Sequence, residues 1–188
     1  LMEEELELAI ATAEEEMQNA LNHFESELTK IRAGKANPFM LDGIQVPYYG
    51  SMSPLKNVSG INTPDPKTLV IQPFEKSLLK DIEKAILDAN LGFTPSNDGM
   101  VIRINIPPLT EERRRGLAKQ ARTESEHCKV SIRTARKDAN EYIKGLVKAG
   151  MPEDMGKGGE EKVQNLTNAY AAKTDAHLAA KEKEIMTV

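Results

Sequence analysis

The longest segment of this sequence without a proline lies between Pro108 and Pro152, and within it the chain from Thr110 to Gly150 is typical of one continuous helix. Apolar residues recur along it at helical spacing, and a single helix of this length would extend about 60 Å at 1.5 Å per residue. Thr110 is a suitable N-cap, and Glu111 and Glu112 place negative charge at the positive end of the helix dipole. Lys148 and Gly150 are typical of a helix end. An average helix has about 11–12 residues, so this segment constrains the fold more than any other.

A helical projection of this segment separates an apolar sector from a basic sector. The apolar sector must pack on something and contains Leu117, Ala121, Cys128, Ile132, Ala135, Ala139, Ile143 and Leu146. The basic sector lies roughly 130° round the helix. It contains Arg115, Lys119, Arg122, Lys129, Arg133 and Arg136. Glu126 is its only acid, so little compensates the charge. Such side chains can simply be solvated, but an extended cationic ridge favours a long anionic partner, most naturally a nucleic-acid backbone.

The whole chain is not basic, which limits nucleic-acid contacts to local patches. Its 188 residues carry a formal net charge of −4. The first sixteen residues contain seven glutamates and neither Lys nor Arg, whereas nine cations and two acids lie between Arg113 and Lys137. A hydrophobic content of 39% without tryptophan suits long amphipathic helices rather than a large globular core.

The single cysteine, Cys128, allows no intramolecular disulfide and no cysteine-based metal cluster. Because it lies in the apolar sector, we expect it to contribute packing rather than a nucleophile. No apolar run approaches the length needed to span a membrane, and the acidic N-terminal segment is unlike a signal or transit peptide. We therefore expect a cytoplasmic protein without membrane contacts.

Two further helices are predicted at the ends of the chain. The first runs from Met2 to Arg32 and is broken by Gly34 and Pro38. Its apolar seam has heptad-like spacing and contains Ile10, Ala13, Met17, Leu21, Phe24, Leu28 and Ile31. The last helix is predicted from about Glu160 to Met186, after a glycine-rich flexible loop over residues 150–159. Both helices need neighbouring helices that bury their apolar stripes.

The segment from Met40 to Ile106 has a different character, with recurring prolines and short runs of β-branched and aromatic residues. These runs predict strands at residues 44–49, 67–72 and 101–106. A helix is predicted at residues 77–90. The segment therefore forms a small α/β module of about seventy residues, within the usual size of a domain.

The predicted fold is α+β with two domains. An elongated antiparallel three-helix bundle comprises residues 1–33 and 107–188, and a small α/β domain, residues 34–106, is inserted after the first helix. The connections near 33–35 and 106–108 could act as a hinge, the alternative being a rigidly docked pair. The hinge residues are Ala33, Gly34, Lys35, Ile106, Pro107 and Pro108.

The sequence contains no recognisable catalytic or metal-binding motif. His23, His127 and His177 lie on three different predicted helices, and none belongs to an HExxH or Cys/His ligand spacing. The glycine-rich run at residues 156–159 follows no strand and lacks phosphate-loop spacing. No GxSxG elbow occurs. We expect no enzymatic activity, no cofactor, no catalytic residue and no metal site.

Several blocks of the chain resemble the ribosome recycling factor family. Residues 30–38, KIRAGKANP, are similar to a KIRxGRA-P block, and residues 41–44 and 48–50 follow in family order. Residues 107–114 read PPLTEERR, like a second signature. Residues 130–140, VSIRTARKDAN, resemble a V-x-x-R-x-x-R-[RK]-D-A-N block. The blocks occur in the same order as in the family and span nearly the whole chain.

The resemblance implies an L-shaped monomer in which the bundle binds large-subunit rRNA and the α/β domain moves on a hinge. It implies that the protein splits post-termination 70S-type ribosomes into subunits together with elongation factor G and GTP, releasing mRNA and deacylated tRNA. Arg136 corresponds to the arginine critical for rRNA contact, and Arg133 and Arg32 match family basic positions. Lys137 stands where relatives often carry Arg, which keeps the charge but loses bidentate phosphate geometry.

The predicted rRNA-binding set combines these positions with the basic sector. It comprises Arg136, Arg133, Lys129, Arg122, Arg115, Lys119, Arg32 and Lys137. Two other functions remain open from the residues alone. A coiled-coil or chaperone-like interaction protein would oligomerise through its apolar seams and bind partners independently of salt. A general binder of structured RNA would bind naked helices as tightly as ribosomes.

Overall fold

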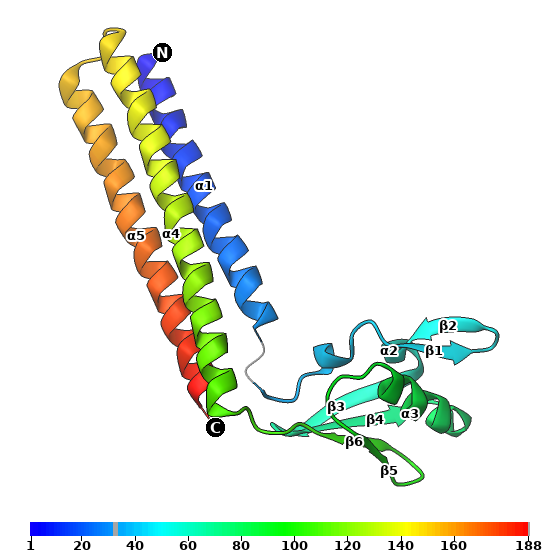
Figure 1. Ribbon diagram of the computed structural model, residues 1–188. Coiled ribbons are helices and arrows are strands. Elements are labelled where there is room, and N and C mark those ends of the chain that lie inside the picture. The colour runs from blue at the N-terminus through cyan, green and yellow to red at the C-terminus, as the bar shows by residue number, and fades with distance from the viewer. Residues whose placement is uncertain (32–33, 188) are drawn as a thin grey trace. The chain divides into compact units, whose positions relative to one another are not determined.

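The computed structural model describes residues 1–31 and 34–187, and the chain divides into two compact units (Figure 1). Unit 1 comprises Leu1–Ala33 and Glu111–Val188, and unit 2 comprises Gly34–Thr110. Unit 1 is a helix bundle, and unit 2 is a β-sheet domain inserted after the first helix. The predicted α+β class and the insertion are confirmed.

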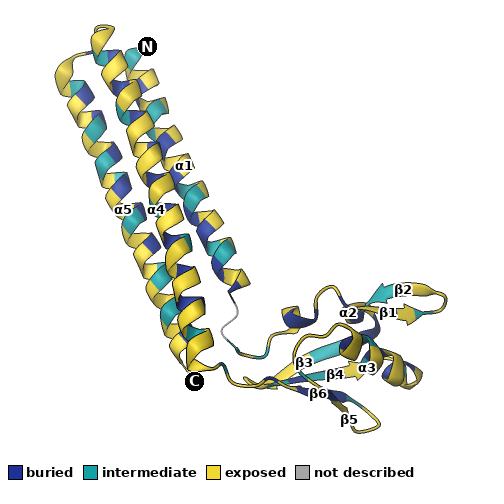
Figure 2. Cartoon of the chain, in the orientation of Figure 1, coloured by how far each residue is buried: buried dark blue, intermediate teal, exposed yellow. Residues whose placement is uncertain are grey.

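The bundle consists of α1 (Met2–Lys30), α4 (Glu111–Lys148) and α5 (Glu153–Met186), which pack side by side (Figure 1). Figure 2 shows buried positions recurring along each helix, separated by exposed ones. Every residue of the predicted apolar sector of α4 is buried, so this prediction is confirmed. None of the helices in the described part of the chain is long and apolar enough to cross a membrane.

The predicted loop at residues 150–159 is wrong over most of its length, because α5 already begins at Glu153. Gly156 and Gly159 are buried in this helix. A Cβ atom at Gly159 would lie 2.6 Å from Cδ1 of Leu6, and one at Gly156 would lie 2.6 Å from a valine methyl group of α4. Glycine therefore lets α5 approach both neighbours closely, and this packing offsets its poor helix propensity of about 1 kcal/mol per residue.

The other bundle helices end within two residues of the predicted positions. α4 begins one residue after Thr110, and Gly150, at φ 116°, lies in the connection to α5. α1 ends at Lys30 rather than at Arg32, which lies outside the described residues. Hydrophobic periodicity located these elements, while their last turns depend on local capping.

Unit 2 contains a four-stranded antiparallel sheet in the order β3-β4-β6-β5 and a separate hairpin, β1-β2. The strands are β1 (Gln45–Tyr48), β2 (Ser51–Pro54), β3 (Ser59–Asp65), β4 (Thr68–Pro73), β5 (Pro95–Asn97) and β6 (Ile102–Asn105). The helices are α2 (Leu55–Val58) and α3 (Leu79–Asp88), with 3-10 turns at Pro38–Leu41 and Lys76–Leu78.

The three strands predicted from sequence are β1, β4 and β6, and the predicted helix is the 3-10 turn at Lys76–Leu78 continued by α3. β6 alternates as expected, since Ile102 and Ile104 are fully buried while Arg103 is exposed. β2, β3 and β5 were not predicted. Their segments, SMSP, SGINTPD and PSN, lack apolar alternation, so pairing with neighbouring strands determines their conformation.

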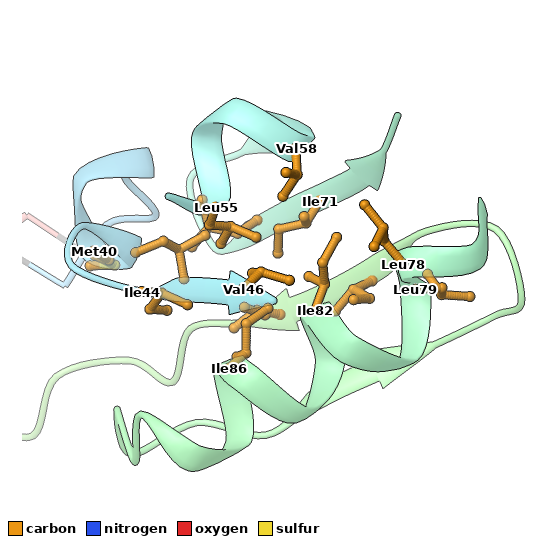
Figure 3. Packing of buried hydrophobic residues seen from close by; sticks show 14 of the residues in the cluster. Met40, Ile44, Val46, Leu55, Val58, Ile71, Leu78, Leu79, Ile82 and Ile86 are labelled. Carbon is orange, nitrogen blue, oxygen red and sulfur yellow. The ribbon is translucent and has the colours of Figure 1, made fainter. Parts of the chain in front are cut away.

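The core of unit 2 lies between α3, the β1-β2 hairpin and the four-stranded sheet. Figure 3 shows Ile82 and Ile86 of α3 close to Val46 of β1, with Ile71 of β4 in the same cluster. All four side chains are almost completely buried. Unit 2 therefore has a hydrophobic core of its own.

Candidate nucleic-acid interface

The basic sector of α4 is exposed along the side of the helix that adjoins α5. Arg122 Nη1 lies 3.5 Å from Glu182 Oε1 of α5, and Lys129 Nζ lies 2.6 Å from Asp175 Oδ1. Lys129 is half-buried. The other members are exposed: Arg115, Lys119, Arg122, Arg133 and Arg136. The predicted sector therefore exists as one continuous face.

The expectation that little compensates this charge is wrong for half of the sector. Arg122 and Lys129 are paired with acids of α5, and Arg115 Nη2 donates a 2.7 Å hydrogen bond to Oε1 of Glu111, one turn earlier in α4. Two of the three compensating acids belong to α5, so a projection of α4 by itself could not include them. Exposed pairs of this kind contribute roughly 0–1 kcal/mol each. Each of these cations must therefore give up an acidic partner, at a cost of up to about 1 kcal/mol, before it can bind another anion.

Four other cations of the predicted rRNA-binding set have no such partner among the described residues. Among the described residues, Lys119, Arg133, Arg136 and Lys137 make no ion pair. The last three lie at positions i, i+3 and i+4 of α4, so their side chains are neighbours on the helix surface. We call Arg133, Arg136 and Lys137 the cationic cluster. It concentrates unpaired positive charge within about one helical turn.

The register of α4 against α5 explains why this cluster is unpaired. The two interhelical ion pairs described above define an antiparallel register. Continued along α5, it brings Arg133 level with Ala171 and Arg136 level with Asn168. Nε2 of Gln164 donates a 2.8 Å hydrogen bond to Oδ1 of Asn168. The part of α5 opposite the cluster therefore presents neutral side chains.

Asn140 lies next to the cluster and has a feature that was not predicted from the sequence. It follows Arg136 by one helical turn, and its side-chain Oδ1 is buried without a hydrogen-bond partner in the described part of the chain. An unsatisfied buried acceptor is uncommon in a native structure. The available signal was its place as the last residue of the VSIRTARKDAN block.

At the proposed hinge, the outgoing connection is described from Gly34 onward. Arg32 and Ala33 lie outside the described residues. Gly34 has φ 76°, which disfavours any side chain, and a Cβ atom there would lie 2.6 Å from Cγ of Leu109. Lys35 is exposed. The two connections therefore approach each other within unit 2, and only glycine fits at the point of contact.

Both connections are held by the turn between β3 and β4. The backbone N–H of Ala36 donates to the carbonyl of Pro66, and that of Ile106 donates to the carbonyl of Lys67, each at 2.7 Å. Ile106 is buried, whereas the prolines at 107–108 are exposed. The connections thus leave unit 2 side by side from one anchored point.

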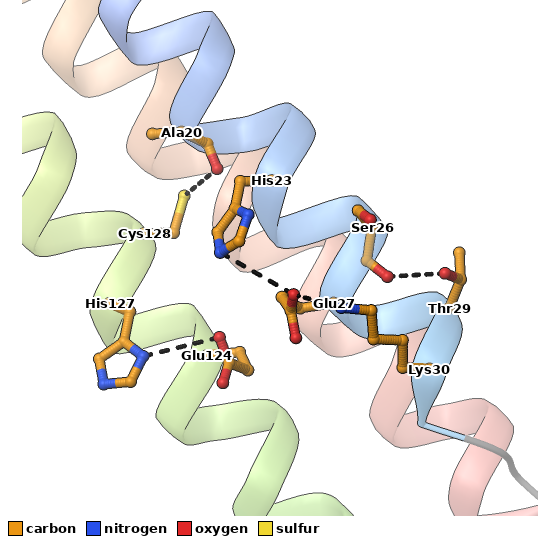
Figure 4. Close-up of polar contacts among 9 residues, drawn as sticks. All are labelled: Ala20, His23, Ser26, Glu27, Thr29, Lys30, Glu124, His127 and Cys128. Atoms are coloured by element: carbon orange, nitrogen blue, oxygen red, sulfur yellow. Dashed lines mark hydrogen bonds and ion pairs between the residues drawn. The ribbon is translucent and has the colours of Figure 1, made fainter.

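Cys128 packs in the bundle, as predicted. Its Sγ lies 3.5 Å from the carbonyl oxygen of Ala20 in α1 and 3.4 Å from Oγ1 of Thr174 in α5 (Figure 4 shows the first contact). Burial raises the pKa of the Cys128 thiol above its usual value. A buried thiol held in its protonated form is a poor nucleophile.

The histidines each approach a glutamate at the bundle surface. His23 lies 4.0 Å from Glu27 within α1, and His127 lies 3.6 Å from Glu124 within α4 (Figure 4). His177 of α5 lies 2.9 Å from a glutamate of α1. In the described part of the chain, no group of three or more His, Cys, Asp or Glu side chains could hold a metal ion.

Comparisons with protein families and with individual known proteins point to the same family. The family model "Ribosome recycling factor" matches residues 24–186. The ribosome-recycling factor of Flavobacterium johnsoniae is 57% identical over 187 residues, covering 100% of both chains. That of Cytophaga hutchinsonii is 55% identical over 185 residues, covering 98% of this chain and 100% of the relative.

Two solved structures are similar over nearly the whole chain. The solution structure of a ribosome recycling factor has a TM-score of 0.72 and 38% identity, with 98% of each chain covered. The second contains the T. thermophilus ribosome recycling factor and E. coli elongation factor G bound to the E. coli post-termination complex. Its TM-score is 0.59 and its identity 41%, with 97% of this chain and 99% of that chain covered.

Proposed function

This chain belongs to the ribosome recycling factor family, and we infer from that membership that it acts with elongation factor G on post-termination ribosomes. It is a translation factor rather than an enzyme. Its partners are the ribosome and elongation factor G, and we place it in the cytoplasm with them. We propose that it splits the ribosome into subunits, releasing mRNA and deacylated tRNA, with GTP hydrolysis supplied by elongation factor G.

We propose that the cationic cluster of α4 makes the principal contact with large-subunit rRNA. The observation that carries this assignment is that Arg133, Arg136 and Lys137 are exposed and unpaired among the described residues, opposite a neutral part of α5. Unpaired cations gain the most from phosphate, because no existing ion pair must be broken first. Such contacts position a protein on folded RNA without reading its sequence.

We assign a secondary role in the same contact to the other cations of the sector. Arg115, Arg122 and Lys129 would have to exchange an acidic partner for phosphate, so each contributes less. Lys119 is unpaired among the described residues but lies apart from the cluster. Arg32 lies outside the described residues, and its role rests on the family resemblance.

We further propose that the two connections form a hinge between the bundle and unit 2. Supporting this are the close approach of Gly34 to Leu109 and the anchoring of both connections at the β3–β4 turn. Ile106 is buried and anchored in unit 2, so rotation would occur at Gly34, Lys35, Pro107 and Pro108. It would let elongation factor G, pushing on unit 2, strain the rRNA contact of the bundle. The protein would then transmit force without hydrolysing a nucleotide itself.

Co-sedimentation with post-termination ribosomes over a salt series tests the proposed function. Affinity should fall steeply as salt rises, because each phosphate contact releases counterions. Addition of elongation factor G and GTP should split the ribosomes, as measured by light scattering. The protein should remain monomeric in analytical ultracentrifugation.

Two outcomes would overturn the proposal. Salt-insensitive binding together with oligomers would favour a coiled-coil or chaperone-like protein. Equal affinity for ribosomes and for a naked RNA duplex, without splitting, would favour a general RNA binder.

A further inference from the structure

A groove lies between α1 and α4, on the side of α4 opposite to the basic sector. Its volume is about 280 Å³. Ala13, Ala135 and Ala139 are among the buried residues that line it, and their short side chains leave the space open. Leu8 of α1 and Tyr142 of α4 also line it and remain 66% and 50% exposed. The groove thus offers apolar surface that nothing in unit 1 covers.

The rim of this groove is acidic. Glu5 and Glu16 of α1 and Asp138 of α4 line it, and we call these three residues the acidic rim. None of them makes an ion pair within the described part of the chain, and no Lys or Arg occurs among the lining residues. The first sixteen residues add further glutamates and no cation. The negative potential at the groove is therefore uncompensated.

The charge of the rim selects among possible occupants. It repels phosphate, so the surface that carries the groove is unsuited to rRNA, unlike the basic sector on the α5 side of the same helix. Anionic lipid head groups are excluded for the same reason. An occupant must offer an apolar side chain to the alanine-lined floor and positive charge to the rim. A protein segment that carries an apolar side chain beside Lys or Arg residues provides both.

We propose that the α1–α4 groove binds a cationic amphipathic segment of a partner protein, through Leu8 and Tyr142 for its apolar residue and the acidic rim for its Lys or Arg side chains. Two complementary faces result, one for rRNA and one for protein. The assignment of that partner to the ribosome rests on the proposed function, whereas the chemistry of the occupant does not.

Binding of a synthetic peptide to the full chain tests the groove without ribosomes. The probe is a fluorescent twelve-residue peptide of leucine and lysine in an amphipathic helical pattern, and its control has the same composition in scrambled order. Fluorescence anisotropy should show at least about tenfold tighter binding of the patterned peptide. Leu8→Ser and the double change Glu16→Lys/Asp138→Lys should each lower the affinity for the patterned peptide about tenfold.

Matched variants control for a general loss of apolar surface or negative charge. Val130 is 51% exposed on α4 outside the groove, so Val130→Ser should leave peptide binding unchanged. Glu161 is exposed on α5 and does not line the groove, so Glu161→Lys should also leave peptide binding unchanged. Equal losses for groove and control variants, or equal binding of both peptides, would overturn the proposal. If the chain self-associates and the double change removes this self-association, the occupant is a second copy of the chain, which would also overturn the proposal.

A second experiment locates the occupant on the ribosome. A photo-crosslinking amino acid at position 8 should react with a Lys- or Arg-rich protein segment on purified post-termination ribosomes, whereas the same group at position 133 should react with rRNA. Crosslinks from position 8 to rRNA would contradict the protein assignment. If neither position 8 nor position 133 crosslinks to the ribosome while the peptide binds normally, the proposed ribosomal function is wrong and the groove assignment survives.

Discussion

The two halves of the basic sector of α4 differ in their neighbours rather than in their residue types. Toward the start of the helix, Arg122 and Lys129 meet Glu182 and Asp175 of α5. Toward its end, the cationic cluster faces the neutral part of α5 around Asn168. Equivalent cations on one helix face are therefore partly neutralised in one half and, among the described residues, unpaired in the cluster at the other end. The position of a charge on a helix does not determine whether it is available to a ligand.

The largest expected effect of this difference comes from removing one cation from each half. Arg136→Ala should lower ribosome affinity by about tenfold to a hundredfold, because it removes a charge-assisted hydrogen bond to phosphate. Arg122→Ala should lower it only about threefold, since that cation already has an acidic partner. Affinity is measured by co-sedimentation at constant salt, and Lys162→Ala, at an exposed position of α5, is the control. Helicity and melting should change little in all three variants. Equal losses for Arg136→Ala and Arg122→Ala would show that pairing does not matter.

A smaller effect is expected from giving the cluster an acidic partner. Asn168→Asp places a carboxylate level with Arg136 and should weaken ribosome binding by about three- to tenfold, since the new pair must be broken before phosphate binds. Asn19→Asp introduces the same charge at an exposed position of α1 and should have little effect. Binding curves for both variants at two salt concentrations provide the measurement. If both weaken binding alike, net charge rather than local pairing is responsible.

The smallest effect is expected from freeing a cation in the paired half. Asp175→Asn releases Lys129, so ribosome affinity should rise by about twofold and the salt dependence should become steeper. Glu161→Gln removes an acid that makes no ion pair among the described residues and serves as the control. Unchanged affinity and salt dependence in Asp175→Asn would place Lys129 outside the rRNA contact.

Hydrophobic periodicity made the long helices predictable. The apolar sector of α4 could be identified from sequence because residues such as Ile132 and Ile143 recur with a period that forces one face inward. The seam of α1 is likewise buried at Met17 and Phe24, as predicted. The insertion after α1 followed from the change in proline and β-branched content beyond Gly34.

The sequence was less informative where structure depends on a distant neighbour. The start of α5 was missed because glycines such as Gly156 normally signal a loop, and their use here is to let helices approach. β3 and β5 were missed because their pairing with β4 and β6, rather than their own composition, makes them strands. The VSIRTARKDAN block could have marked the position of Asn140, but the unsatisfied oxygen of its side chain is a property of the packed bundle.

The sequence by itself determined the length of α4, its buried face, the exposed row of cations and the family of the chain. These depend on residue order along one helix or one motif, which local geometry converts directly into a surface. Only the tertiary structure decided which cations pair with acids and where an acid-rimmed groove opens. Both depend on the register of helices far apart in sequence, since an ion pair or a groove requires two surfaces whose relative position is set by packing.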